Sequence, residues 1–188
     1  YECDLMINIG ARFDDRITGK IDEFSPKSKK VHIDIDPSSI NKNVKVDLAI
    51  VGDVKTVVAS TIKTLNKKKP NFVKSNKQKT SKWWEKIQKW RSKRSLDYIG
   101  SEETIKPQYA IERLYELTKD KDTYITTEVG QHQMWAAQHY KFNKPNRWMT
   151  SGGLGTMGYG LPAAVGVQVA HPKKLVIDIA GEASVLMT

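Results

Sequence analysis

The sequence predicts an α/β protein of doubly wound parallel sheets, and two observations lead to this fold class. Short apolar runs end at a glycine or an acidic residue, as in residues 4–10, 30–36 and 48–53. Segments with apolar residues three and four positions apart, the spacing of a helix, alternate with such runs. This alternation is typical of parallel strands joined by helices that cover the sheet. A Lys-rich stretch separates two regions of this kind, so we expect two domains.

The first region, residues 1–66, contains the three predicted strands named above and one predicted helix. The helix is "VKTVVASTIKTL", residues 54–65, in which the apolar residues recur at helical spacing. Parallel strands end at the same edge of a sheet. Residues that follow these three strands are therefore expected to lie close together.

The middle region, residues 67–101, carries the basic charge of the chain. Residues 63–94 hold thirteen Lys or Arg and one acid, whereas the remaining residues hold 18 basic and 20 acidic groups. Residues 67–81 are polar and show no apolar pattern, which predicts a linker. Residues 82–93 follow as an amphipathic helix with Trp83, Ile87 and Trp90 on one side. Because Lys dominates and the aromatic residues cluster, we interpret this charge as a solvated surface and not as a nucleic-acid interface.

The second region, residues 102–188, repeats the alternation of helices and strands. A helix over 106–118 is expected to start at Pro107 and to face inward with Ile111, Leu114 and Tyr115. A strand over 123–130, a helix over 131–140, a glycine-rich loop leading into a small-residue helix, and a strand in "KLVIDIAGEAS" follow in that order.

Several classes of protein are disfavoured by composition. No stretch approaches the roughly 18 apolar residues of a membrane span. The start of the chain has neither Met nor the pattern of a signal peptide, and we expect a piece of a longer polypeptide. A lone Cys3 excludes an internal disulfide and agrees with a reducing compartment.

Polar and charged residues at the predicted strand ends of the first region suit an anionic, nucleotide-type ligand. Gly10 allows a tight turn and a close approach of the backbone to a ligand. Arg12 and Arg16 add charge-assisted donors for a diphosphate or an anionic substrate. The acids at the ends of the other strands, Asp34, Asp36 and Asp53, suit ribose hydroxyls, although each of them could instead cap a helix.

The second region offers a comparable set of residues. Gln131 and His132 lie between a strand and a helix, where backbone amides and the imidazole could meet an anion, although a lone His is more often structural. In the loop "SGGLGTMGYG", tight packing of a helix on the sheet accounts for Gly158 and Gly160 better than for the glycines at 152–155. Glu182 ends the last strand, either to cap a helix or to hold a cation.

Five blocks of the sequence closely resemble the large, catalytic subunits of acetohydroxyacid synthase (acetolactate synthase), a family of thiamin-diphosphate enzymes. They are "GARFDDRITGKIDEF", "VHIDIDPSSINKN", "IKPQYAIERLYELT", "TTEVGQHQMWAAQHYKF" and "SGGLGTMGYGLPAAVG". The resemblance runs almost end to end and is weakest over residues 67–82. It implies the end of a central FAD-binding domain in 1–66, a linker and helix in 67–101, and the start of a thiamin-diphosphate-binding domain in 102–188.

The resemblance also implies an activity, cofactors and partners. Members of the family decarboxylate pyruvate and join the two-carbon unit to a second 2-ketoacid, which leads to branched-chain amino acids. Their cofactors are thiamin diphosphate, Mg²⁺ and FAD. They form dimers or tetramers with active sites between subunits, act with a small regulatory subunit, and are cytoplasmic in bacteria or organellar in eukaryotes. No nucleic acid and no membrane are implied.

Carried over residue by residue, the resemblance assigns four sets of site residues. The FAD set is Gly10, Ala11, Arg12, Phe13, Asp14, Asp34, Ile35, Asp53, Val54, Gln133, Met134 and Gly152. The thiamin-diphosphate set is Gln131, His132, Gly155, Thr156, Met157, Ala183 and Ser184. Asp15 and Arg16 match the substrate channel, and Glu182 matches a ligand of Mg²⁺.

The metal motif departs from the family pattern. "GEAS" stands where the family has Gly-Asp-Gly, so Glu182 is one methylene longer and Ala183 restricts a positive φ. The family's activating glutamate lies upstream and its Asn metal ligand lies downstream of these residues. We therefore expect no catalytic residue within the chain and no activity from the chain alone. Two alternatives stay open, another thiamin-diphosphate carboligase or decarboxylase, and a non-catalytic relative with an altered metal motif.

Overall fold

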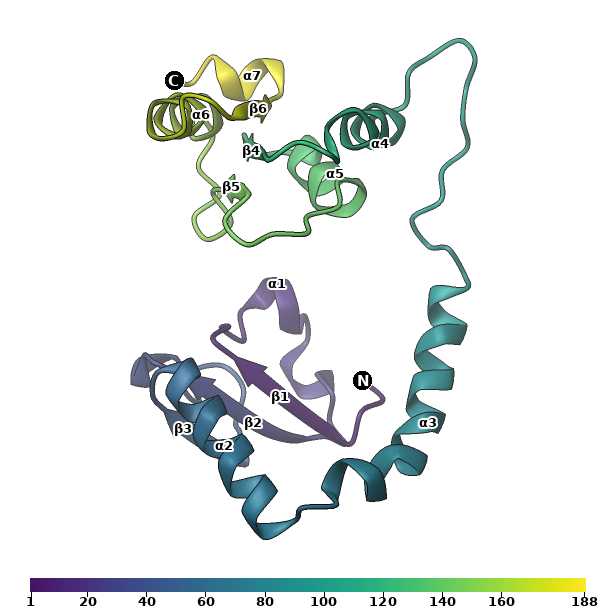
Figure 1. Ribbon diagram of the computed structural model, residues 1–188, viewed down its shortest axis with the longest axis vertical. Coiled ribbons are helices and arrows are strands. Elements are labelled where there is room, and N and C mark those ends of the chain that lie inside the picture. Colours follow the sequence, from purple (N-terminus) through teal and green to yellow (C-terminus); the bar gives the residue numbers. More distant parts are fainter. The chain divides into compact units, whose positions relative to one another are not determined.

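The computed structural model describes residues 1–188, except for the side chains of residues 78 and 79. The chain forms two compact units, Tyr1–Trp90 and Arg91–Thr188 (Figure 1). Both are α/β units with parallel sheets, as the alternation in the sequence predicts. No helix among the described residues is both long and apolar enough to cross a membrane.

The first unit contains a three-stranded parallel sheet in the order β1-β2-β3, so its strands end at a common edge. The strands lie where they are predicted, and helix α2 begins directly after β3, as the apolar spacing of residues 54–65 indicates. The elements are β1 (Leu5–Ile9), α1 (Asp15–Thr18), η1 (Ile21–Glu23), β2 (Lys29–Asp34), η2 (Pro37–Ser39), β3 (Leu48–Val51) and α2 (Val54–Lys68).

The core of the first unit forms around the aromatic ring of Phe13. This ring lies edge-on to Phe24, at 5.8 Å between ring centroids, and to His32, at 5.2 Å. Phe13 is 7% exposed and His32 is fully buried. The turn that follows β1 is thus fixed to the sheet by a buried aromatic cluster.

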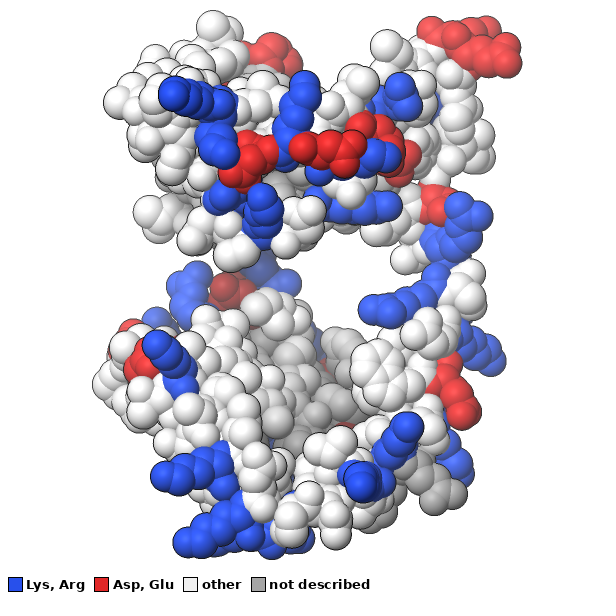
Figure 2. All heavy atoms as spheres, viewed as in Figure 1, with Lys and Arg blue, Asp and Glu red and all other residues white. Residues whose placement is uncertain are grey.

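Helix α3 (Phe72–Arg91) differs from the prediction for the middle region. The expected linker over 67–81 was wrong, because α2 continues to Lys68 and α3 begins at Phe72. Lys, Gln and Ser permit a helix without an apolar stripe, so a test based on periodicity misses it. The rings of Trp83 and Trp90 meet edge-on at 5.6 Å, as expected for one helix face, and Figure 2 shows Lys and Arg side chains along α3.

The second unit also contains a three-stranded parallel sheet, here in the order β5-β4-β6. Strand β4 lies at the centre and all five of its residues are buried. The elements are α4 (Pro107–Thr118), β4 (Thr123–Thr127), α5 (Gln131–His139), β5 (Trp148–Thr150), α6 (Gly160–Ala170), β6 (Leu175–Ile179) and α7 (Glu182–Val185).

The core of the second unit packs α4 and α5 against the sheet. Ile111, Ile125 and Tyr140 are its buried members, and Leu114 and Tyr115 pack against them. The predicted inward face of α4 is therefore confirmed. This core leaves the ends of the strands free to build sites at the two edges of the sheet.

Candidate functional site

The carboxyl ends of three parallel strands meet at one edge of the second unit. Thr127 at the end of β4 pairs with Thr150 of β5 and with Ile179 of β6. The segments 128–131, 151–158 and 180–184 therefore leave the sheet at the same edge, which is where open α/β sheets bind ligands.

Glu128 is the first residue after β4 and is fully buried. Its carboxylate accepts three backbone N–H bonds, from Gly158 at 2.7 Å, from Tyr159 at 3.1 Å and from Leu161 at 3.0 Å. These amides form the start of α6, whose dipole also favours a negative charge there. Glu128 thus holds the glycine-rich loop to the strand end. The sequence signal for this role was an acid that continues a buried strand.

Two glycines of the loop allow close packing at this edge. A Cβ on Gly160 would lie 2.5 Å from the Asp178 Oδ1 and 2.6 Å from the Glu128 nitrogen, and one on Gly158 would lie 2.7 Å from the Met187 oxygen. The prediction that tight packing of a helix on the sheet accounts for these glycines is confirmed for Gly160, whereas Gly158 packs against the backbone of Met187, which follows α7.

The rest of the glycine-rich loop is exposed and folds on the side chain of Ser151. The Thr156 N–H donates to the Ser151 Oγ at 2.9 Å, and Gly155 has a φ of 68°. Gly152 and Met157 are exposed as well. A Cβ on Gly152 would meet only the Thr150 side chain, at 3.9 Å, so packing within the unit does not account for this glycine.

His132 lies between the ends of β4 and β6. A Cβ on Gly130 would come within 2.8 Å of its Cε1 atom, and one on Gly181 within 3.1 Å. The Nε2 atom is buried and has no hydrogen-bond partner among the described residues. A buried polar atom without a partner is costly, and here it lies beside the amide-rich strand ends. The arrangement suits an anionic group that would accept a hydrogen bond from the imidazole.

The neighbours of His132 on α5 divide between the interior and the surface. Gln133 donates from Nε2 to the Thr150 Oγ1 at 2.7 Å, whereas Gln131 and Met134 are exposed. Asp178 on β6 accepts from the Thr126 hydroxyl at 2.8 Å. Burial raises the pKa of Asp178, and the nearby Glu128 raises it further against the effect of the Thr126 bond. Sequence reasoning missed Asp178, because it lies inside an apolar run.

Glu182 is the first residue of α7 and is exposed. Among the described residues its carboxylate makes no hydrogen bond and no ion pair, so it is available to a cation. Ser184 is buried and donates to the Gly181 carbonyl at 3.1 Å, whereas Ala183 is exposed. No group of three or more His, Cys, Asp or Glu side chains within the described part of the chain could hold a metal by itself.

In the first unit the corresponding edge carries the turn after β1. Gly10 adopts a φ of 63°, in the left-handed region, and its N–H donates to Ile33. The carbonyl of Ala11 accepts a bond from the Asn8 Nδ2 at 2.6 Å and lies 3.0 Å from the His32 Nε2. Two side chains that sequence reasoning missed, Asn8 and His32, thus fix the shape of this turn.

The acids at the ends of β2 and β3 are engaged locally. Asp53 caps α2 by accepting from the N–H and the hydroxyl of Thr56, at 3.0 and 3.1 Å, and Asp36 caps η2 in the same way through Ser38. Asp34 accepts from the Asp36 N–H at 2.9 Å. The capping alternative therefore describes Asp36 and Asp53, although their exposed positions leave room for further partners.

The remaining residues of the first unit fall into a buried group and an exposed group. Phe13 is buried in the core, so only its backbone can reach a ligand. The Asp14 carboxylate pairs with Arg12 at 3.3 Å through one oxygen, while its buried Oδ1 has no partner among the described residues. Ala11, Arg12, Asp15, Arg16, Ile35 and Val54 are exposed.

Two models of one enzyme family match parts of the chain, one in each unit. A family model described as the central domain of thiamine pyrophosphate enzymes matches residues 1–61, and one described as their C-terminal TPP binding domain matches residues 128–188. The acetolactate synthase large subunit of Haemophilus influenzae is 45% identical over 187 residues, which cover 100% of this chain and 32% of that protein.

Other relatives show the same extent of similarity. The acetolactate synthase isozyme 3 large subunit of Escherichia coli K12 is 44% identical over 100% of this chain and 32% of its own length. The acetolactate synthase large subunit of Porphyra purpurea is 49% identical over 99% of this chain and 30% of its own length. The chain spans about a third of the length of the curated relatives it matches. It therefore belongs to the thiamine pyrophosphate enzyme family and, within that family, is similar along its whole length to acetolactate synthase large subunits.

Proposed function

We propose that the chain is part of an acetolactate synthase that condenses two 2-ketoacids with loss of CO₂, in branched-chain amino-acid biosynthesis. The observation that carries this proposal is the buried, unpartnered Nε2 of His132 at the carboxyl edge of the second unit. An anionic group bound there would relieve the cost of that orphaned atom. The similarity of the whole chain to acetolactate synthase large subunits gives the anion a chemical identity, the diphosphate of thiamin diphosphate.

The proposed thiamin-diphosphate site uses the three segments that leave the edge of the sheet. His132 and the N–H groups at the start of α5 face the diphosphate, with Gln131 beside them. The exposed loop that contains Gly155, Thr156 and Met157 approaches the thiamin rings, and Ala183 and Ser184 contribute backbone N–H groups. When bound, the cofactor supplies the carbanion chemistry that protein side chains lack. The residues of this chain hold and orient it, and Glu128 keeps the glycine-rich loop in place.

The proposed metal ligand is Glu182, which would hold Mg²⁺ against the diphosphate. A free carboxylate at a strand end fits a hard cation that prefers oxygen ligands. Because no metal cluster exists among the described residues, the other ligands would come from the diphosphate, water and the rest of the polypeptide. Glu182 and Ala183 replace the Asp and Gly of the family pattern, so we expect a shifted backbone at this turn.

In the first unit, we propose FAD as the ligand of the turn after β1. Gly10 brings the backbone close, Arg12 is exposed for an anionic group, and the buried Asp14 Oδ1 is an unused acceptor. Asp15 and Arg16 follow the turn and are exposed, which suits a channel for an anionic 2-ketoacid. The remaining proposed contacts in this unit are Phe13 through its backbone, together with Ala11, Asp34, Ile35, Asp53 and Val54. That Gln133, Met134 and Gly152 of the second unit also bind FAD stays a prediction from the resemblance.

The test uses the full-length polypeptide that contains this chain. We expect it to form acetolactate from pyruvate when thiamin diphosphate, Mg²⁺ and FAD are present. In Glu182→Gln, which keeps length and loses charge, the Mg²⁺ concentration for half-maximal activity should rise at least about tenfold. Calorimetry should show that thiamin-diphosphate binding weakens in parallel, since metal and diphosphate bind together.

The matched control is Glu102→Gln, which makes the same chemical change at an exposed position outside the site. It should leave both quantities unchanged. An unchanged Mg²⁺ requirement in Glu182→Gln would remove Glu182 from the metal site. No acetolactate from the full-length protein would instead favour a non-catalytic relative, the second candidate, which the altered "GEAS" motif supports. A homodimer or tetramer, a small regulatory subunit and a cytoplasmic or organellar site belong to the same proposal.

A further inference from the structure

A second polar cavity lies at the amino edge of the sheet in the second unit, where β4, β5 and β6 begin. Its volume is about 220 Å³. The lining comes from residues 118–123 before β4, residues 140–144 after α5, and Arg147 before β5. We call it the amino-edge pocket. The residues proposed to hold thiamin diphosphate and Mg²⁺ lie at the carboxyl ends of the same strands and are absent from its lining.

The amino-edge pocket has a surplus of positive charge. Two acids line it, Asp120 and Asp122. The five cations of the lining exceed these two acids by three charges. Two ion-pair partners lie outside the lining, Glu116 on Lys119 and Lys174 on Asp122. Their charges have opposite signs, so the surplus stays at three. The cations of the lining are Lys119, Lys121, Lys141, Lys144 and Arg147.

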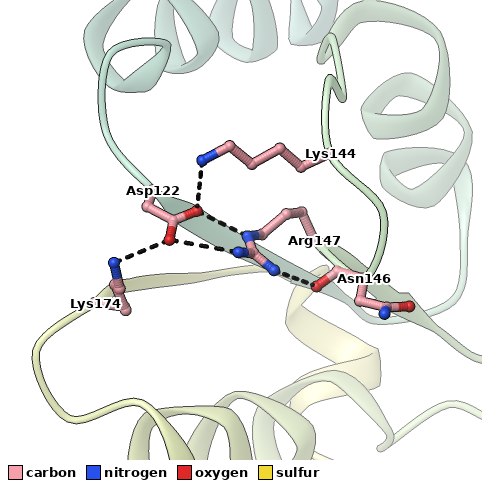
Figure 3. Close-up of polar contacts among 5 residues, drawn as sticks. All are labelled: Asp122, Lys144, Asn146, Arg147 and Lys174. Carbon is pink, nitrogen blue, oxygen red and sulfur yellow. Dashed lines mark hydrogen bonds and ion pairs between the residues drawn. The ribbon is translucent and has the colours of Figure 1, made fainter.

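Asp122 is the centre of the network, and it is saturated (Figure 3). Arg147 donates to both of its oxygens, at 2.8 and 3.4 Å, and Lys174 donates at 2.9 Å. Lys144 reaches the same carboxylate only at 3.4 Å, a long distance for an ion-paired hydrogen bond. One carboxylate cannot neutralise three cations, so Lys144 keeps donors and charge for another acceptor.

Other donors of the lining have no acidic partner at all within the described residues. Lys121 and Lys141 form no ion pair with any side chain in the described part of the structure, and Lys141 instead lies over the Tyr115 ring at 5.5 Å. The hydroxyl of Thr123, a lining residue that is 7% exposed, is buried and has no hydrogen-bond partner among the described residues. The lysines could simply be solvated, or they could serve only to bind Asp122. Neither role explains why the Thr123 hydroxyl is buried without a hydrogen-bond partner.

We propose that the amino-edge pocket binds a phosphate group, either as inorganic phosphate or as the end of a small phosphomonoester. A tetrahedral dianion can accept bonds from several directions, which suits a pocket lined by lysines from two segments. The planar fork of Arg147 is already used by Asp122, so recognition relies on the point charges of Lys121, Lys141 and Lys144. The small volume limits the ligand to a phosphate and a short attached group.

The experiment is a titration with inorganic phosphate of the full-length polypeptide that contains this chain, saturated with thiamin diphosphate and Mg²⁺, followed by amide chemical shifts at constant ionic strength. We expect saturable shifts confined to residues 118–123 and 140–147. Lys144→Gln and Lys121→Gln should each weaken the affinity by about 3–10-fold, because each removes one charge-assisted contact. The control Lys173→Gln, an exposed neighbour outside the lining, should change it less than about 2-fold.

A parallel titration with glycerol 3-phosphate distinguishes the two sources of phosphate. Tighter binding of glycerol 3-phosphate identifies an esterified ligand, and equal or weaker binding identifies the free anion. The wild-type shift map tests the proposal even if a variant fails to fold. Shifts that do not saturate, shifts spread over the whole chain, or an equal loss of affinity in Lys173→Gln would overturn the proposal.

Discussion

The two edges of the sheet in the second unit use opposite means to hold their loops. At the carboxyl edge, glycines and backbone amides hold the loops. One buried carboxylate, that of Glu128, accepts hydrogen bonds from three N–H groups. At the amino edge, long charged side chains surround one carboxylate, that of Asp122, whose side chain is 24% exposed. The contacts of the Glu128 carboxylate at the carboxyl edge are thus buried, whereas the ion pairs at the amino edge are partly open to solvent.

This difference predicts how the stability of the second unit responds to substitutions at each edge. A bond to a buried charge has no water to replace it when it is lost, so its removal is costly. A network of exposed ion pairs is screened by solvent and depends on pH and salt. We therefore expect substitutions at the carboxyl edge to lower stability strongly, and substitutions at the amino edge to change its dependence on conditions.

The largest effect is expected for Glu128→Ala. The substitution leaves three N–H groups at the start of α6 without an acceptor in a buried position and should destabilise the second unit by about 3–5 kcal/mol. Urea denaturation followed at the second unit measures this, with Glu102→Ala as the exposed control. A loss of unfolding free energy similar to that of the control would mean that water replaces the carboxylate as the acceptor of these three N–H groups.

The next effect is expected for Gly160→Ala. The new methyl group would meet the Glu128 nitrogen at 2.6 Å, and backbone cannot move aside as a flexible side chain can. We expect a loss of about 1–3 kcal/mol from overpacking. A stability equal to that of the wild type would show that α6 can shift away from the strand ends, and a crystal structure of the variant would locate the shift.

At the amino edge, Asp122→Asn should change how stability depends on pH. Arg147, Lys174 and Lys144 hold the pKa of Asp122 well below its usual range. The folded state therefore binds this proton less readily than the unfolded state. The stabilisation is present above a pH of about 4 and is lost as the pH falls toward the lower folded pKa.

Thermal unfolding from pH 7 to pH 2 measures this contribution. The melting temperatures of the wild type and Asp122→Asn should differ most at pH 7 and converge below a pH of about 4. A difference that stays constant with pH would mean that the side chain acts by packing and not by charge. Added salt at pH 7 should also reduce the difference, which it should not do for Glu128→Ala.

The smallest effect is expected for Gly166→Ala, which serves as the matched control for Gly160→Ala within α6. A Cβ at Gly166 would meet no atom within 4 Å. The gain in helix propensity should stabilise the unit by about 0.5–1 kcal/mol. A loss of stability in Gly166→Ala would show that α6 as a whole does not tolerate substitution. The effect of Gly160→Ala could then not be attributed to crowding at the strand ends.

The sequence predicts much of this fold because its signals are local. Apolar or β-branched runs that stop at Gly or an acid identify every strand except β5, and the inward face of α4 follows from helical spacing. Strand β5 was not predicted, because its three residues are too few to show a pattern. The helical state of residues 72–81 was not predicted, because that segment forms a helix with little apolar patterning. The packing role of Gly160 was also predictable, since crowding of a helix on a sheet requires glycine, whereas the contact of Gly158 with Met187 joins two loops and was not predicted.

The polar networks could not be predicted in the same way, because they join residues that are distant in sequence. The partners of Glu128 follow it by 30 to 33 positions, and only the strand order brings them together. The position of the amino-edge network, in contrast, was predictable from the sequence. Asp122, Arg147 and Lys174 each come immediately before a strand of one parallel sheet, so they must meet at its amino edge.

The central position of β4 has a consequence for folding during synthesis on the ribosome. This strand is made before both of its neighbours, and the bond from Thr126 to Asp178 closes a separation of 52 residues. Until β5 and then β6 have left the exit tunnel, at least one side of β4 stays open to foreign strands. Its sequence, TYITT, is rich in β-branched residues and has no charge. We therefore expect the nascent second unit to be most prone to aggregation from the time β4 emerges until β6 has followed it.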